Sequence, residues 1–308
     1  MAIVGAGVSG LTCGVAFAER SFRTKIFAEH VGTQTTSGAA GALWFPYDAE
    51  PADKVIPWAL ATYKVLVDLA KDPGSGVSMI ELRQYCRSGK IEIPDWASSF
   101  VIPSGVEGSL NVSIFKSGFA VRVPLMDTTI YLDYLAKRFE KAGGGIKEGM
   151  HFESLNDVDG DLVINCAGIG ARELASDPDL ESHRGQVAIV PKIDNLERAI
   201  VCDYAPLMYA IPRTNDCVFG GTNDVSDDLN PDPATTKAIV AECSRVLKIE
   251  NPRVLRERVG LRPFRKSGVR LEKEKLSDGR TVIHNYGHGG AGFTMSWGCA
   301  ENVLRIAD

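Results

Sequence analysis

The chain has 308 residues, which is enough for one large domain or for two interleaved domains. Hydrophobic residues make up 44% of it, so a sizeable core can form, and the net charge of -5 comes from mixed signs without a basic run. This balance argues against a nucleic acid or an anionic membrane as the main partner and favours a small molecule.

The seven cysteines are dispersed, and none of them stands in a C-x-x-C spacing: Cys13, Cys86, Cys166, Cys202, Cys217, Cys243 and Cys299. This pattern favours reduced, buried thiols over a disulfide framework or a zinc site, and it leaves one bridging pair open. We predict no metal site. No signal peptide is visible, and no apolar run approaches the roughly 18 residues of a membrane span, so we expect a soluble intracellular protein.

The first predicted unit is an apolar strand, residues 2–4, that runs into Gly5-x-Gly7-x-x-Gly10 and then a helical pattern. In this fingerprint the glycines allow a tight turn, a close approach of the backbone to a pyrophosphate, and close packing of the helix on the strand. A second strand ends at Glu29, 19 positions after Gly10, near the usual place of a ribose-binding carboxylate. The sequence therefore predicts a dinucleotide site; a glycine-rich loop without a ligand is the alternative.

A polar loop over residues 32–38 leads into the run 39–47, which is rich in alanine and glycine. Its hydroxyls and amides suit a phosphate or the edge of a flat ring, and a plain loop with a buried edge explains the pattern equally well. Helical spacing of apolar residues then predicts an amphipathic helix over 57–71. Residues 77–125 alternate short β-like runs with turn residues, which predicts an antiparallel sheet as a second layer.

The middle of the chain returns to the first layer. Asp127 is placed to cap a helix over 128–142, and a strand over 162–166 ends in a glycine turn at Gly168, where a parallel sheet places cofactor contacts. From Gly185 onward, β patterns resume around a helical stretch over 233–247. A last strand over 281–286 runs into a glycine loop that opens the final helix, 293–306, and such a loop presents N–H groups to an electron-rich group.

Seven blocks in one order together resemble the family of D-amino-acid oxidases. They are Gly5-x-Gly7-x-x-Gly10, Thr35-Thr36-Ser37 before Gly41-Ala42-Leu43-Trp44, Val163-Ile164-Asn165-Cys166-Ala167-Gly168, Arg184-Gly185-Gln186, Gly260-Leu261-Arg262-Pro263, Val269-Arg270-Leu271-Glu272 and His284-Asn285-Tyr286-Gly287-His288-Gly289-Gly290. The resemblance implies an FAD enzyme that deaminates D-amino acids oxidatively to imino and 2-oxo acids, with O2 reduced to hydrogen peroxide. No general base is then required, because a neutral amine gives hydride from Cα to the flavin.

The predicted fold class is α/β, with a Rossmann-type FAD-binding domain interleaved with an antiparallel-sheet α+β substrate domain. The expected boundaries are 1–48, 142–184 and 281–308 for the FAD-binding domain, and 49–141 and 185–280 for the substrate-binding domain. Other activities stay open: D-aspartate oxidation, glycine or sarcosine oxidation, NAD-linked dehydrogenation, and binding without turnover.

The resemblance also assigns cofactor contacts. Pyrophosphate binding falls to the first turn, the adenosine end to Glu29 and His30, and adenine to Phe152; the family usually has arginine where His30 stands. The remaining expected contacts are to phosphates and the flavin. The full set is Gly5, Ala6, Gly7, Val8, Gly10, Glu29, His30, Thr35, Thr36, Ser37, Gly41, Ala42, Leu43, Phe152, Gly168, Gly287, Gly289, Gly290, Gly292, Phe293 and Thr294.

Substrate binding is expected from Arg270 and Tyr209, which the resemblance places on the carboxylate, and from the carbonyl of Gly290, which it places on the amine. Taken alone, an arginine in such a strand more often faces solvent. Asn223 stands where D-aspartate oxidases lead us to expect an arginine, so we expect neutral or bulky D-amino acids to be favoured. Residues 203–208 resemble a short lid, and His288 is expected to be a structural loop residue.

The expected partners are the D-amino acid and O2, with no nucleic acid or membrane, and a homodimer is left open. We expect a cytoplasmic or peroxisomal location. The final residues, 305–308, are not the peroxisomal address Ser-Lys-Leu.

Overall fold

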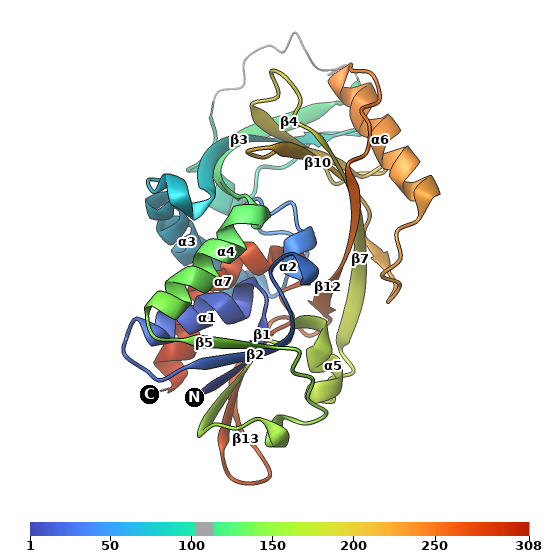
Figure 1. Ribbon diagram of the computed structural model, residues 1–308. Coiled ribbons are helices and arrows are strands. Elements are labelled where there is room, and N and C mark those ends of the chain that lie inside the picture. The colour runs from blue at the N-terminus through green and yellow to red at the C-terminus, as the bar shows by residue number, and fades with distance from the viewer. Residues whose placement is uncertain (103–113, 308) are drawn as a thin grey trace.

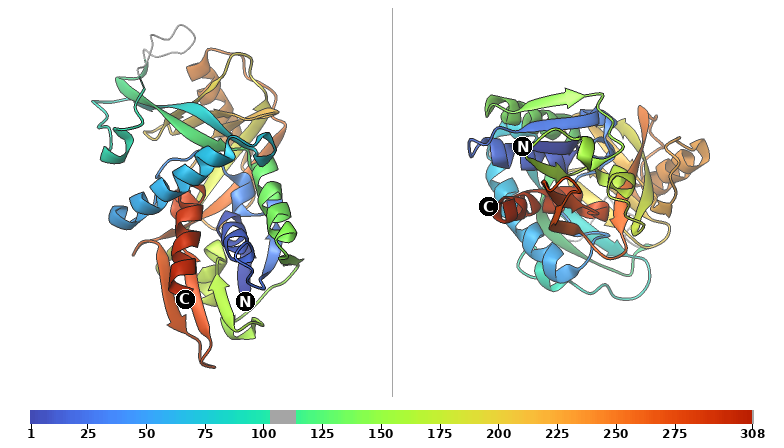
Figure 2. Two further views of the ribbon diagram at one scale, coloured as in Figure 1. Left: turned by 90° about the vertical axis from the view of Figure 1, so that its left-hand side faces the viewer. Right: turned by 90° about the horizontal axis from the view of Figure 1, so that it is seen from below.

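A computed structural model describes residues 1–102 and 114–307. The chain forms two sheets, one below and one above in Figure 1, and the long strands β7 and β12 run from the upper sheet towards the lower one. The first and last described residues lie on the same side of the molecule, as Figures 1 and 2 show. Residues 103–113, inside the predicted antiparallel segment 77–125, and residue 308 lie outside the described residues.

The first sheet is mostly parallel and carries the nucleotide fingerprint. Its strand order is β13-β14-β6-β1-β2-β5, and only β13 runs antiparallel to its neighbour. Its central strand β1 is buried on both faces, as expected for a sheet covered on both sides. The bounds are β1 (Ala2–Ala6), β2 (Lys25–Val31), β5 (Gly145–Glu148), β6 (Leu162–Asn165), β13 (Arg270–Lys275) and β14 (Thr281–Tyr286).

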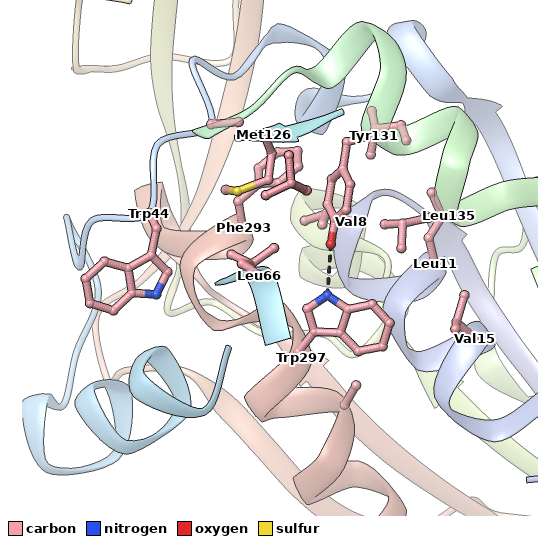
Figure 3. Close-up of a cluster of buried hydrophobic side chains, with 14 of the residues drawn as sticks. Val8, Leu11, Val15, Trp44, Leu66, Met126, Tyr131, Leu135, Phe293 and Trp297 are labelled. Carbon is pink, nitrogen blue, oxygen red and sulfur yellow. Dashed lines mark hydrogen bonds between the residues drawn. The ribbon is translucent and has the colours of Figure 1, made fainter. Parts of the chain in front are cut away.

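Helices α1 (Val8–Ala18), α4 (Thr128–Lys141) and α7 (Gly292–Ala307) pack together on one side of this sheet, and α3 (Ala52–Leu69) crosses α7 (Figure 2). Figure 3 shows their shared core, in which Trp297 of α7 donates a hydrogen bond to the hydroxyl of Tyr131 of α4 at 2.8 Å. The carboxylate of Asp127 caps α4 by accepting from the Thr129 amide. These contacts fix the start of α1 beside the carboxyl end of β1.

The second sheet is mostly antiparallel, with strand order β11-β7-β10-β9-β8-β3-β4 and with β12 paired to β7. Its bounds are β3 (Val77–Cys86), β4 (Ser117–Met126), β7 (Leu180–Pro191), β8 (Arg198–Cys202), β9 (Met208–Pro212), β10 (Asp216–Gly220), β11 (Asp224–Val225) and β12 (Arg256–Arg265). Helix α6 (Pro233–Leu247) covers the outer face, where Ala188, Val190 and Phe219 pack against it (Figure 1). Because side chains alternate along a strand, Val187 and Tyr209 are left on the inner face.

Most predicted elements are present, and the differences concern short or exposed strands. β5, β8 and β11 were not predicted, and the expected loop at 32–38 contains the start of the short helix α2 (Thr36–Ala39). The short helix α5 (Ala171–Leu174) follows the glycine turn after β6. Several expected domain boundaries differ from the layers: β7 runs through position 184, β13 belongs to the first sheet because it pairs with β14, and α4, expected in the substrate-binding domain, packs against α1 on the first sheet.

All seven cysteines fall within the described residues, where each is a buried free thiol. Within residues 1–102 and 114–307, no helix is both long and apolar enough to cross a membrane.

Candidate active site

A cavity of about 680 Å³ lies between the carboxyl ends of the parallel strands and the inner face of the antiparallel sheet. Residues from both sheets line it, from Glu29 and Phe152 at one end to Tyr209 and Arg262 at the other. Ligands in open α/β sheets bind at this edge of the parallel strands, and the volume is in the range of small-molecule and cofactor sites.

The turn between β1 and α1 presents its backbone to the cavity. Gly5 has a φ of +103°, and a Cβ there would lie 2.4 Å from the carbonyl oxygen of Cys166, so only glycine fits. A Cβ at Gly7 would approach the Ser37 hydroxyl to 3.1 Å, and that hydroxyl accepts a hydrogen bond from the amide of Val8 at 3.0 Å. The bare backbone, a serine hydroxyl and the start of α1 together suit a pyrophosphate.

The adenosine end is more open. The carboxylate of Glu29, with 59% of its side chain exposed, lies 3.5 Å from Nδ1 of His151 and 4.0 Å from Nε2 of His30. Phe152 packs edge-on against Phe27 and lines the same end of the cavity. His151 was not singled out in the sequence, because nothing in its pattern marks a residue between two strands as a partner of Glu29.

The middle of the cavity is formed by the segment around Leu43 and by the loop before α7. A Cβ at Gly290 would lie 2.5 Å from the Tyr47 ring, so this loop is held close to that tyrosine. His288 is buried, its Nε2 lies 3.0 Å from the side-chain oxygen of Asn285, and burial lowers its pKa to about 4. A neutral imidazole held in this way fits the structural role expected from the sequence.

Three of the predicted cofactor residues do not line the cavity. A Cβ at Gly10 would lie 1.9 Å from the Gly5 carbonyl oxygen, so this glycine serves the packing of α1 on β1. Gly287 has a φ of +81° and turns the chain behind the site, and the hydroxyl of Thr294 bonds the backbone of Phe45 at 3.1 and 2.9 Å. All the other predicted cofactor-binding residues line the cavity.

The far end of the cavity holds Tyr209 of β9 and Arg262 of β12. Two glycines leave the space that these side chains occupy. A Cβ at Gly220 would lie 2.0 Å from Tyr209, and one at Gly185 would lie 2.5 Å from the Arg262 guanidinium. Nη1 of Arg262 donates to the carbonyl of Thr222 at 3.0 Å and to the side-chain oxygen of Asn223 at 3.1 Å. The guanidinium is therefore held by neutral acceptors, and among the described residues no carboxylate lies within 4.0 Å of it.

The same end contains further polar groups among apolar walls. Asn223 donates to the hydroxyl of Tyr47 at 3.2 Å, and burial, with the charge of Asp203, raises the pKa of Tyr47 to about 12. Burial also raises the pKa of Tyr209, against the opposing effect of Arg262. Both phenols therefore stay protonated at neutral pH and can donate. Leu43, Phe45, Leu82, Leu207 and Ile211 supply apolar surface around them.

The structure does not bring Arg270 to the cavity, which corrects its expected pairing with Tyr209. Arg270 lies at the edge of the first sheet, where its guanidinium bonds Glu272 at 2.6 Å, Glu274 at 2.8 Å and the Tyr286 hydroxyl at 2.9 Å. The cause is the pairing of β13 with β14, which carries this strand away from the antiparallel sheet. The sequence held a signal for this, because Arg270, Glu272 and Glu274 alternate and so share one face of a strand.

Arg262 lines the cavity together with Tyr209, where Arg270 was expected. It stands in the block Gly260-Leu261-Arg262-Pro263, which was noted in the sequence without a role for its arginine. The predicted lid also differs in part: Leu207 lines the cavity, whereas Tyr204 does not, and 44% of Tyr204 is exposed.

Comparison with known proteins agrees with this site. Residues 1–305 match the family model described as FAD dependent oxidoreductase. The chain is 38% identical to a D-amino-acid oxidase from Rubrobacter xylanophilus, over 99% of this chain and 94% of that protein. It is 39% identical to one from Streptomyces coelicolor, over 99% and 95%, and 31% identical to a D-aspartate oxidase from Homo sapiens, over 99% and 94%.

Solved structures support the fold. A glycine oxidase from Geobacillus kaustophilus superimposes with a TM-score of 0.82 at 16% identity, over 99% of this chain and 93% of that one. The family model that matches almost the whole chain is FAD dependent, so the cofactor is FAD. The site fits this cofactor, because its glycines leave room for a pyrophosphate and an acid lies at the adenosine end. The chain belongs to the family of FAD-dependent oxidoreductases that includes the D-amino-acid oxidases.

Proposed function

We propose that this protein oxidises D-amino acids to imino acids, which hydrolyse to 2-oxo acids, while O2 is reduced to hydrogen peroxide. The observation that carries the proposal is one cavity that joins the nucleotide-binding turn to a half-buried end containing Arg262 and Tyr209. Bound FAD supplies the acceptor for a hydride from the substrate Cα and passes the two electrons to O2. The residues of the chain supply binding and orientation.

Arg262 and Tyr209 are the proposed carboxylate-binding pair. A guanidinium can hold a carboxylate through two parallel hydrogen bonds, and a phenol that stays protonated can add a third. Because Thr222 and Asn223 already hold one side of Arg262, its fork is fixed before a ligand arrives. We also propose that the carbonyl of Gly290 accepts from the substrate amine, since this residue lines the cavity close to Tyr47.

The walls of the cavity bear on the substrate side chain. Leu43, Phe45 and Leu207 give it apolar surface, which favours neutral or bulky side chains. Asn223 stands where the resemblance to D-aspartate oxidases would predict an arginine, and it bonds Arg262 and Tyr47. This favours neutral or bulky D-amino acids over D-aspartate as substrates, with D-aspartate, glycine and secondary amines as the alternatives to test.

The test combines a visible spectrum with peroxide release on D-alanine and on L-alanine. A flavin spectrum that bleaches anaerobically with the D-isomer alone, together with peroxide in air, is the expected result. A colourless protein that needs added NAD would contradict the cofactor. A flavin that responds to no D-amino acid would contradict the activity and leave the fold unaffected.

Two expectations from the sequence stay predictions. A homodimer predicts twice the mass of the chain in light scattering of the purified protein. If the protein is cytoplasmic or peroxisomal, cell fractionation should recover the native protein in the cytosolic or in the peroxisomal fraction.

A further inference from the structure

An acidic side chain stands at the substrate end of the cavity. Asp203 directly follows β8, and alternation along the strand places it on the same face as Val201. Val201 pairs with Tyr209 across β8 and β9, so Asp203 lies one step along the inner face from the proposed carboxylate-binding tyrosine. Asp203, Val201, Leu207 and Tyr209 all line the cavity.

Among the described residues, only one of the two carboxylate oxygens of Asp203 accepts a hydrogen bond. Its Oδ2 accepts from Nε2 of the buried Gln84 at 2.8 Å, and within residues 1–102 and 114–307 no donor bonds its Oδ1. In the same described ranges it forms no ion pair within 4.0 Å with Arg262, which bonds neutral acceptors instead. Burial raises the pKa of Asp203, against the opposing effects of the Gln84 hydrogen bond and of the charge of Arg262.

Two charges of opposite sign therefore line the same cavity, Arg262 on β12 and Asp203 after β8. The positive charge of Arg262 suits the α-carboxylate, and the negative charge of Asp203 stands further along the inner face. Neighbouring strands lie about 4.8 Å apart, and a lysine-type side chain has a four-carbon stem that can cross such a spacing. The apolar surface of Leu207, which lines the same cavity, suits the methylenes of such a stem.

We propose that Asp203 binds the cationic end of the substrate side chain, so that the enzyme prefers D-amino acids with an ammonium or guanidinium group, such as D-lysine, D-ornithine and D-arginine. This inference rests on the proposed function, because Arg262 and Tyr209 must fix the α-carboxylate first. It refines the expectation of neutral side chains: the walls are apolar, and the end of the pocket is acidic.

The test compares substrates matched in length. For the holoenzyme, kcat/KM for peroxide release is measured on D-lysine and on D-norleucine, which lacks the charge. In the wild type the ratio of the two is expected to exceed one. Asp203→Asn keeps an acceptor for Gln84 and removes the charge, so it is expected to lower kcat/KM for D-lysine roughly 10- to 100-fold and leave that for D-norleucine within about threefold.

The matched control is Asp224→Asn, which makes the same change in charge at an exposed residue of β11 that does not line the cavity. Its D-lysine to D-norleucine ratio is expected to equal that of the wild type. A second variant, Asp203→Lys, is expected to reverse the preference and raise the relative rate on D-glutamate.

Two outcomes would overturn the inference while leaving the proposed function standing. One is a wild-type ratio at or below one, which needs no variant to measure. The other is an Asp203→Asn enzyme, with normal FAD content, that loses activity on D-lysine and D-norleucine equally, as a structural role would require. Failure of the proposed function looks different, because the wild-type flavin would then be reduced by neither substrate nor by D-alanine.

Discussion

The two ends of the cavity are built in different ways. The nucleotide end is made by turns after parallel strands, and it offers mostly backbone at Gly5 and Gly7 together with the hydroxyl of Ser37. The substrate end is made by the inner face of an antiparallel sheet, and it offers side chains, above all Tyr209 and Arg262, over a floor of glycines. The first end depends on contiguous sequence, whereas the second depends on strand pairing and on which face each residue occupies.

The largest effect is expected from the charge at the substrate end. Arg262→Ala should lower kcat/KM for a D-amino acid roughly 100- to 1000-fold, because the proposed bidentate partner of the carboxylate is lost. FAD content should stay normal, since Arg262 is bonded to Thr222 and Asn223 and not to the nucleotide-binding turn. Steady-state peroxide assays and the flavin absorbance measure both quantities.

Arg270→Ala is the matched control, because it removes the same side chain from the other sheet. Its guanidinium bonds Glu272, Glu274 and Tyr286 at a partly exposed edge, so the variant should lose about 1 kcal/mol of unfolding free energy and keep its KM. A KM that rises in Arg270→Ala and not in Arg262→Ala would reverse the assignment of the two arginines.

The next largest loss of activity is expected from a substitution at Gly220, which lies against the Tyr209 ring. Gly220→Ala places a methyl group 2.0 Å from the Tyr209 ring, so the ring must move. A displacement of a positioning group by about 1 Å can cost about 100-fold in rate, and we expect a loss of 10- to 100-fold in kcat/KM. Gly145→Ala is the control, because no atom lies within 4 Å of a Cβ there. Equal kinetics in the two variants would contradict the steric role of Gly220.

The same contrast explains how far the sequence could predict this structure. The fingerprint from Gly5 to Gly10 and the acid at Glu29 are local, so most residues that line the nucleotide end could be predicted from the sequence; Gly10, which does not line it, and His151, which was missed, are exceptions. Arg262 and Arg270 both stand in predicted strands, and the pairing of β12 with β7 and of β13 with β14 decides which of the two reaches the cavity. Strand pairing is a long-range property that one sequence does not reveal, and the same limit hid β8 and with it the position of Asp203.

A smaller effect is expected on stability at acidic pH, from His288 between the two ends. Burial lowers its folded-state pKa to about 4, whereas the unfolded value is about 6.5, so the unfolded state binds more protons between these values. Stability should therefore fall as pH falls from about 6.5 to about 4, with about 1 kcal/mol lost between pH 7 and pH 5.5.

Urea unfolding of the wild type and of His288→Gln at pH 7 and pH 5.5 tests this. The variant should show a loss smaller by that amount, because glutamine does not titrate. His151→Gln, at a largely exposed histidine, serves as the control and should keep the wild-type difference. An unchanged pH dependence in His288→Gln would mean that other groups account for the loss.

The smallest effect is expected at the nucleotide end, from Glu29→Gln. Here, too, a charge is removed from the cavity, but 59% of this side chain is exposed, so water already screens its interaction with a ribose hydroxyl. We expect the Kd for FAD to rise about three- to tenfold, and kcat at saturating FAD to stay unchanged. The measurement is FAD titration of the apoprotein by fluorescence quenching, at low and high salt. A loss as large as that of Arg262→Ala would show that the adenosine end closes around its ligand, and the contrast between an open end and a buried end would then hold for the free protein alone.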